Sequence, residues 1–89
     1  MPAKSRLQRL QEELEKHKLE AILLGHLPNI RYLCGFSGSA ALLLVSGRDI
    51  EFFTDGRYTV QAREEVLGAR IHIQKGTSAF AAGLEWLNL

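Results

Sequence analysis

The segment SAALLLVSGRDIEFFTDG, residues 39–56, constrains the fold more than any other part of this chain. Two apolar runs flank Ser-Gly-Arg-Asp at positions 46–49, and a glycine among polar residues between two such runs indicates a β-hairpin. The first strand, residues 39–45, is apolar at successive positions, which is typical of a strand buried on both faces. Such a strand lies inside a sheet, so the hairpin requires further strands beside it.

One helix, one strand and a helical turn are predicted before the hairpin. Leu7, Leu10 and Leu14 recur at i, i+3 and i+7 and predict an amphipathic helix with a single apolar stripe. The run LEAILLG is too short for a helix and ends in glycine, so residues 20–24 are predicted to be a buried strand. Residues 29–36 mix polar and aromatic side chains without alternation, and we expect a short helix there.

After the hairpin the pattern predicts a helix, a strand and another helix. Tyr58, Ala62 and Val66 recur every four residues, with the polar residues between them facing solvent. Residues 70–74 alternate in polarity as a strand does. The run TSAFAAGLEWLNL predicts a last helix, which reaches the end of the sequence without a glycine, proline or polar stop signal. We therefore expect the natural domain to extend further, whereas Met1 indicates a natural start.

This order of elements indicates one α/β domain over residues 1–89, with a mixed sheet and helices on both faces.

Lys plus Arg number 11 and Asp plus Glu number 10, so the charge gives no reason to expect nucleic acid or an anionic membrane as partner. The longest apolar run is too short to span a bilayer, and the charged N-terminus does not resemble a secretory signal. A single cysteine excludes an internal disulfide and fits a reducing cytoplasm.

The stretch GFSGS, residues 35–39, superficially resembles the turn that presents a serine nucleophile. That turn requires Gly-x-Ser-x-Gly after a strand, whereas here the fifth residue is Ser39 and Ser37 precedes a strand. The sequence also pairs no histidine with a carboxylate at a suitable position for a catalytic triad. We interpret the stretch as a glycine-rich turn that leads into the buried strand.

Metal chemistry has little support in the sequence. His26, Cys34 and His72 match no known spacing of metal ligands, and no metal site is predicted. Cys34 lies between Tyr32 and Phe36 without a cation close in sequence, so we interpret it as a small buried hydrophobic residue rather than a reactive thiol.

The segment FTDGRYTVQA offers a different kind of site. Its Asp-Gly turn is followed by Arg57 and Tyr58 at the start of a helix. Together they offer a guanidinium fork for a carboxylate and an aromatic face. Simple packing with a surface arginine is the alternative interpretation.

Two segments carry a resemblance to a known family. NIRYLCGFSGSAALLLVS and FFTDGRYTVQAREEV, in this order, resemble the N-terminal domain of creatinase, prolidase and Xaa-Pro aminopeptidase proteins, and most closely the Xaa-Pro peptidases. The opening RLQRLQEELEKHKLEAILLG is similar to the first helix and strand of that domain. Cys34 stands where threonine is usual, and Ala40 and Ala41 stand where a polar residue and glycine are common, which affects detailed contacts rather than the fold.

The resemblance implies a ribonuclease H-like motif of three layers, α/β/α. Its mixed sheet has the strand order 3-2-1-4-5, with the second strand antiparallel to the rest. Four of these strands are predicted in this sequence, and the fifth is expected beyond Leu89. The fourth strand would then lack a partner along one edge, which favours unwanted pairing.

In this family a following pita-bread domain hydrolyses the bond before proline, using two divalent metal ions (manganese, cobalt or zinc) held by two aspartates, one histidine and two glutamates. No catalytic or metal residue carries over, and we expect residues 1–89 alone to hydrolyse nothing. The N-terminal domain contributes dimer or tetramer contacts and limits substrate length at a neighbouring active site. On that basis Phe36, Ser37, Arg57 and Tyr58 are the predicted pocket-lining or interface residues.

The implied partners are the chain's own catalytic domain, a second subunit in a homodimer, and a peptide substrate with proline in the second position, and the implied location of the protein is the cytoplasm. One alternative is a stand-alone module with this fold that binds a peptide or protein without peptidase activity. A weaker alternative is an independent serine hydrolase that uses Ser37 or Ser39.

Overall fold

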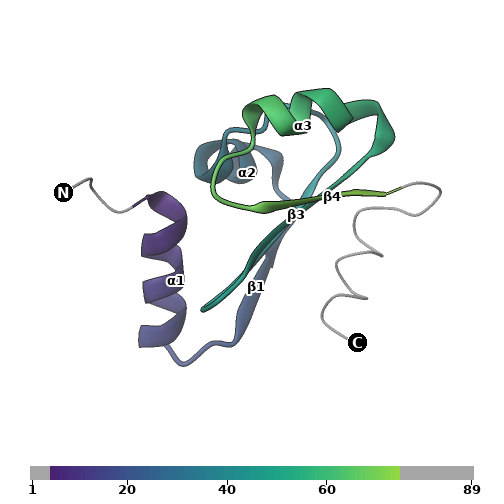
Figure 1. The fold of residues 1–89 in the computed structure, drawn as a ribbon. Helices are drawn as coiled ribbons and strands as arrows, with labels where there is room; N and C mark the ends of the chain where they lie inside the picture. The colour runs from purple at the N-terminus through teal and green to yellow at the C-terminus, as the bar shows by residue number, and fades with distance from the viewer. Residues whose placement is uncertain (1–4, 75–89) are drawn as a thin grey trace.

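The computed structural model describes residues 5–74, which form a four-stranded mixed sheet and the helices packed on it (Figure 1). The elements in chain order are α1 (Arg6–Lys16), β1 (Ala21–Leu24), α2 (Leu27–Cys34), β2 (Leu42–Ser46), β3 (Ile50–Asp55), the 3-10 helix η1 (Gly56–Tyr58), α3 (Thr59–Glu65) and β4 (Arg70–Gln74). Within residues 5–74, none of these helices combines the length and apolar character needed to cross a membrane. The helix predicted after residue 76 lies outside the described residues.

The predicted hairpin is confirmed. β2 and β3 pair antiparallel, and the turn closes where the Ser46 N–H donates to the Asp49 carbonyl at 2.8 Å. β2 begins at Leu42, three residues later than expected. The reason is that the preceding residues bind side chains instead of a neighbouring strand: the Thr54 hydroxyl, for example, donates to the Ala40 carbonyl at 2.6 Å.

The strand order within the described residues is β1-β2-β3-β4. β2 is antiparallel to both neighbours and β4 is parallel to β3, so the expectation of an antiparallel second strand is confirmed. The expected order 3-2-1-4-5 is wrong for these strands, because β4 pairs with β3 and not with β1. The physical reason is the β3–α3–β4 crossover, since a helix between two strands returns the chain parallel to the strand it has just left. The expected fifth strand lies outside the described residues.

The described helices share one buried cluster with one face of the sheet. The cluster contains Leu7 and Leu14 of α1, Ile30 and Cys34 of α2, Ala62 of α3, Leu43, Val45 and Phe52 of the sheet, and the loop residues Phe36 and Val66. The opposite face holds a second cluster of Leu42, Leu44 and Phe53. The helix predicted from the final run of the sequence, and with it any second helical layer, lies outside the described residues.

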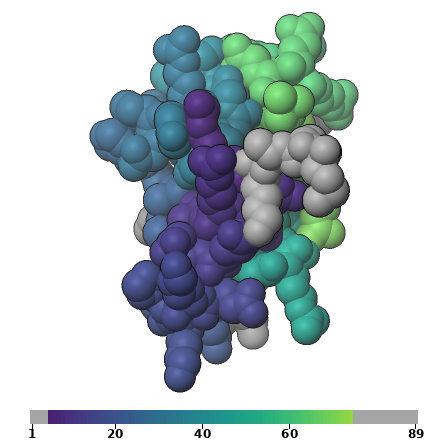
Figure 2. All heavy atoms as spheres, turned by 90° about the vertical axis from the view of Figure 1, so that its left-hand side faces the viewer, coloured from purple at the N-terminus to yellow at the C-terminus, as the bar shows by residue number. Residues whose placement is uncertain are grey.

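The ends of α1 and α2 follow from their sequences. A capping box begins α1 at Ser5: its hydroxyl accepts the Gln8 N–H at 3.1 Å, and the Gln8 side chain accepts the Ser5 N–H at 2.9 Å. α2 begins two residues earlier than expected, because Pro28 fits the first turn of a helix, where its missing N–H costs nothing. Gly35 ends α2 with a φ of 91°, in the left-handed region. Figure 2, viewed onto α1, shows that the surfaces of α2 and α3 lie above it.

Candidate functional site

The glycine turn, residues 35–39, packs against the junction between β3 and α3. The rings of Phe36 and Tyr58 meet edge to face, with their centroids 5.5 Å apart and their planes at 88°. The Ser39 hydroxyl is hydrogen-bonded to the Tyr58 hydroxyl, which also accepts the Ser39 N–H at 3.3 Å. Three of the four predicted site residues, Phe36, Ser37 and Tyr58, therefore belong to one surface region although about twenty positions separate their segments.

Phe36 is the buried residue of this region. Its side chain is 1% exposed and contacts the Phe52 ring of β3 at a centroid distance of 4.8 Å as well as Tyr58. A surface groove of about 430 Å³ runs beside the turn, lined by Leu27, Pro28, Arg31 and residues 36–39. Phe36 thus acts mainly as a core residue that forms the floor of this groove, a combination typical of aromatic side chains.

Ser37, Gln61 and Glu65 form a hydrogen-bonded group, here called the Ser37 cluster. The Ser37 N–H donates to Glu65 Oε1 at 2.9 Å, and the Ser37 hydroxyl donates to Oε2 at 2.9 Å. Gln61 donates to the Ser37 hydroxyl at 3.1 Å and to Glu65 Oε1 at 3.0 Å. These hydrogen bonds, led by the Ser37 N–H, lower the pKa of Glu65 below its usual value. The partners of the Ser37 hydroxyl are a carboxylate and an amide, and the Ser39 hydroxyl bonds Tyr58, so neither serine is paired with an imidazole as a Ser-His-Asp triad requires.

Two glycines set the shape of the turn. A Cβ at Gly38 would lie 2.3 Å from Phe36 Cζ and 3.0 Å from Tyr58 Cε1. A Cβ at Gly35 would lie 2.8 Å from the Glu65 carbonyl oxygen, and the φ of 91° also favours glycine there. The close approach of the turn to Glu65 of α3 therefore depends on Gly35, and its packing against Phe36 and Tyr58 depends on Gly38.

Arg57, the fourth predicted residue, lies at the edge of this region and is already paired. Its Nε and Nη2 donate to the two carboxylate oxygens of Asp55 at 3.0 and 2.8 Å, and its side chain is 70% exposed. The Arg57 guanidinium lowers the pKa of Asp55 through these hydrogen bonds. It also lies 5.2 Å from the centroid of the Tyr58 ring. The fork predicted to bind an external carboxylate is occupied by Asp55.

Gln61 and Glu65 were expected to face solvent, and the sequence reasoning missed their role. A helical signal for them exists, because Tyr58, Gln61 and Glu65 fall at i, i+3 and i+7 and so lie on one side of α3. Tyr58 packs partly against the core, which points that side of α3 toward the glycine turn. The position of Gln61 and Glu65 on the same side of the helix as the partly buried Tyr58 could have indicated that they do not face solvent.

The structure does not bring His26, Cys34 and His72 together. Cys34 belongs to the cluster on the helical face, and burial raises the pKa of its thiol. His72 lies across the sheet, where it stacks on Phe53 at 4.8 Å and contacts the buried Glu51 at 3.1 Å. No group of three metal-ligating side chains occurs in the part of the chain that the structure describes.

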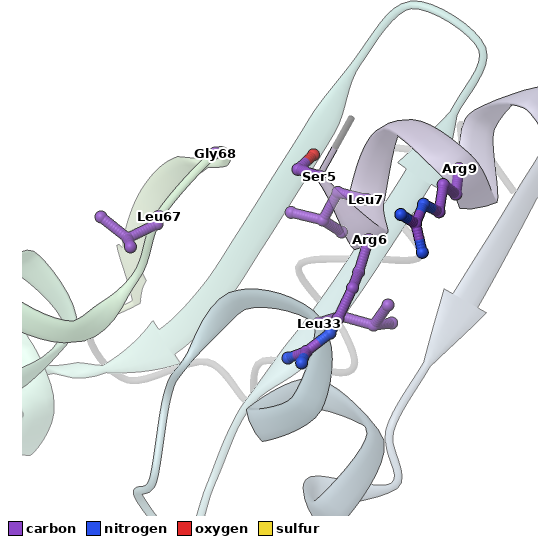
Figure 3. Close-up of a pocket in the computed structure, with 7 residues that line it drawn as sticks. All are labelled: Ser5, Arg6, Leu7, Arg9, Leu33, Leu67 and Gly68. Carbon is purple, nitrogen blue, oxygen red and sulfur yellow. The ribbon is translucent and has the colours of Figure 1, made fainter. Parts of the chain in front are cut away.

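A larger depression of about 520 Å³ lies at the start of α1, away from the glycine turn. Figure 3 shows its lining, which consists of Ser5, Arg6, Leu7, Arg9, Leu33, Leu67 and Gly68. The Arg6 guanidinium donates to the Tyr32 carbonyl at 2.9 Å and stacks on the Tyr32 ring, while Ser5 caps the helix. None of the described lining residues is a carboxylate, a histidine or a cysteine.

Comparisons with known proteins agree on one family. The protein-family model described as "Creatinase/Prolidase N-terminal domain" matches residues 6–88 of the sequence. The uncharacterized peptidase YqhT of Bacillus subtilis is 38% identical over 73 residues, which are 82% of this chain and 20% of that protein. The chain thus spans about a fifth of the length of this curated relative.

Solved structures give the same result. The N-terminal domain of the cytoplasmic peptidase PepQ from Mycobacterium tuberculosis is 38% identical with a TM-score of 0.75, covering 88% of this chain and 62% of that chain. An Xaa-Pro aminopeptidase from Streptococcus pyogenes is 38% identical with a TM-score of 0.77, covering 93% and 65%.

Proposed function

Since the chain belongs to the creatinase/prolidase N-terminal domain family, we propose that it is the non-catalytic domain of a metal-dependent Xaa-Pro peptidase. The peptidases among its relatives support this proposal. The chain also matches only 20% of the curated peptidase, as is expected of one domain of a longer protein. The peptidase would act in the cytoplasm, as the name of the mycobacterial relative says of that protein. Its substrates would be peptides with proline in the second position.

The hydrolytic chemistry belongs to a further domain in this proposal. Two divalent metal ions, manganese, cobalt or zinc, would supply it there. Among the described residues no three potential ligands lie together, and three of the acidic residues have other partners: Asp55 binds Arg57, Glu65 binds Ser37, and Glu51 binds Arg70 and His72. We assign no step of the reaction to residues 5–74.

The role proposed for the chain is to limit access to the active site of a neighbouring subunit in a homodimer. The observation that carries it is the docking of the glycine turn on η1 and α3, which gives the turn one defined shape. Ser37 binds Glu65 of α3, and Ser39 binds Tyr58 of η1. The adjoining groove and the exposed Arg57 provide the surface that would face the neighbour. A loop that must exclude longer peptides needs such a fixed shape.

Peptide-length selectivity of the full-length gene product tests this role. We expect Arg57→Ala and Tyr58→Phe to change the ratio of kcat/KM for long and short Xaa-Pro peptides, while the metal content per subunit stays unchanged. Arg63→Ala, an exposed change elsewhere on α3, is the matched control. An unaltered ratio in both variants would refute the access role.

The gene itself separates this proposal from the stand-alone binding module. A reading frame that continues past Leu89 into metal-ligand motifs supports the peptidase domain. A natural stop codon there supports the module.

A further inference from the structure

Glu65 engages the glycine turn through both its side chain and its main chain. Its carboxylate accepts the N–H and the hydroxyl of Ser37, each at 2.9 Å. Its carbonyl oxygen lies where a Cβ at Gly35 would be only 2.8 Å away. Beyond the helix end, the Leu67 N–H donates to the Cys34 carbonyl at 3.1 Å. Glu65 at the end of α3 therefore contacts the glycine turn directly, and the segment after α3 is bonded to the last residue of α2, just before that turn.

The N–H and the hydroxyl of Ser37 both have hydrogen-bond partners inside the domain. Its N–H is bonded to Glu65, and its hydroxyl is bonded to both Glu65 oxygens and to Gln61. A hydroxyl with these partners has little remaining capacity to bind a peptide. These two groups would then affect a substrate through the position of the turn.

We propose that Glu65 and Gln61 are positioning residues that hold the glycine turn in the conformation that selects peptides, and that Ser37 acts through them rather than by contacting substrate. This inference rests on the access role proposed above. The charge-assisted hydrogen bonds of Glu65 are stronger than neutral ones, which makes its carboxylate the main determinant of the turn position. Gln61, one helical turn before Glu65, donates to both Ser37 and Glu65 and so orients them.

A double-mutant cycle in the full-length peptidase tests the inference. We expect Glu65→Gln and Ser37→Ala each to change the long-to-short ratio of kcat/KM by about three- to tenfold, mainly through KM. The double variant should change the ratio no more than either single variant, because both remove the same contact. Glu64→Gln, the exposed neighbour on α3, should leave the ratio unchanged.

Hydrogen exchange of the segment that contains residues 35–39 gives a second readout. Glu65→Gln should accelerate exchange of this segment while leaving exchange in β2 and β3 unchanged. Gln61→Ala is a milder change and keeps the test available if Glu65→Gln does not fold.

The outcomes separate the two levels of the proposal. If Ser37→Ala changes the ratio and Glu65→Gln and Gln61→Ala do not, Ser37 contacts the substrate directly and the inference is overturned while the access role stands. If none of the Ser37, Glu65, Arg57 and Tyr58 variants changes the ratio, the access role itself fails.

Discussion

Gly38 lies so close to the Phe36 ring that a methyl group on its Cα would be 2.3 Å from Cζ. The ring cannot easily yield, because it is buried and packs edge to face against Phe52 and Tyr58. The pairing of a glycine with an aromatic ring therefore fixes the glycine turn on the core. The glycine thus permits the close packing in which the serines of the turn reach their partners on η1 and α3.

Gly38→Ala should reduce the free energy of unfolding by about 1–3 kcal/mol, because the new methyl group overpacks the core. Gly47→Ala in the hairpin is the matched control, since nothing lies within 4 Å of its added Cβ. Its effect should stay within about 0.5 kcal/mol. Urea unfolding of both variants measures the difference, and equal midpoints would contradict the close packing of Gly38.

Arg70→Met should destabilise the chain, because Arg70 pairs with the fully buried carboxylate of Glu51 across β3 and β4. The loss should be about 1–3 kcal/mol, less than for a fully buried pair because the Arg70 side chain is 62% exposed. Arg48→Met, in the exposed hairpin turn, is the control for loss of a positive charge. Thermal unfolding of the two variants should separate them, and a similar fall in both would refute the specific role of Arg70.

Acid should weaken the Ser37 cluster. The pKa of Glu65 is lower in the folded chain than its usual value of 4.5, so the unfolded chain takes up the proton first as pH falls. The contribution of Glu65 to stability is therefore complete above about pH 4.5 and is lost as pH falls through the folded pKa. Unfolding midpoints measured between pH 6 and pH 3 should fall less steeply in Glu65→Gln than in the parent chain. Identical slopes would show that Glu65 contributes nothing in this range.

Cys34 should react slowly with alkylating reagents in the folded chain. Its side chain is buried, and that burial raises the pKa of the thiol, so little thiolate is present or accessible near pH 8. Mass spectrometry after iodoacetamide treatment should show slow modification in buffer and rapid modification in urea. Equal rates in the two conditions would show that Cys34 is exposed in solution.

The sequence predicted the elements of the fold well because their signals are local. The stripe of Leu7 and Leu14 and the apolar run of β2 are patterns of period and burial that a short segment carries by itself. The strand order was not predictable in this way. It depends on the α3 crossover that places β4 beside β3, which is a relation between distant segments.

The candidate site was predicted in part for the same reason. Phe36 and Tyr58 stand in the motifs that carry the family resemblance, and the structure brings them together. The roles of Gln61 and Glu65 depend on a turn more than twenty residues earlier, and polar residues on a helix usually face solvent. Asp55 had been assigned to a turn, so its occupation of the Arg57 fork was also missed.

The most direct test of the account is peptide hydrolysis by the isolated chain and by the full-length gene product. Both are assayed with an Xaa-Pro dipeptide and tripeptide in the presence of manganese, cobalt or zinc. We expect cleavage by the full-length protein and none by residues 1–89, because the chain provides no hydrolytic centre in this account. Cleavage by the purified 89-residue chain, dependent on the added metal, would contradict it.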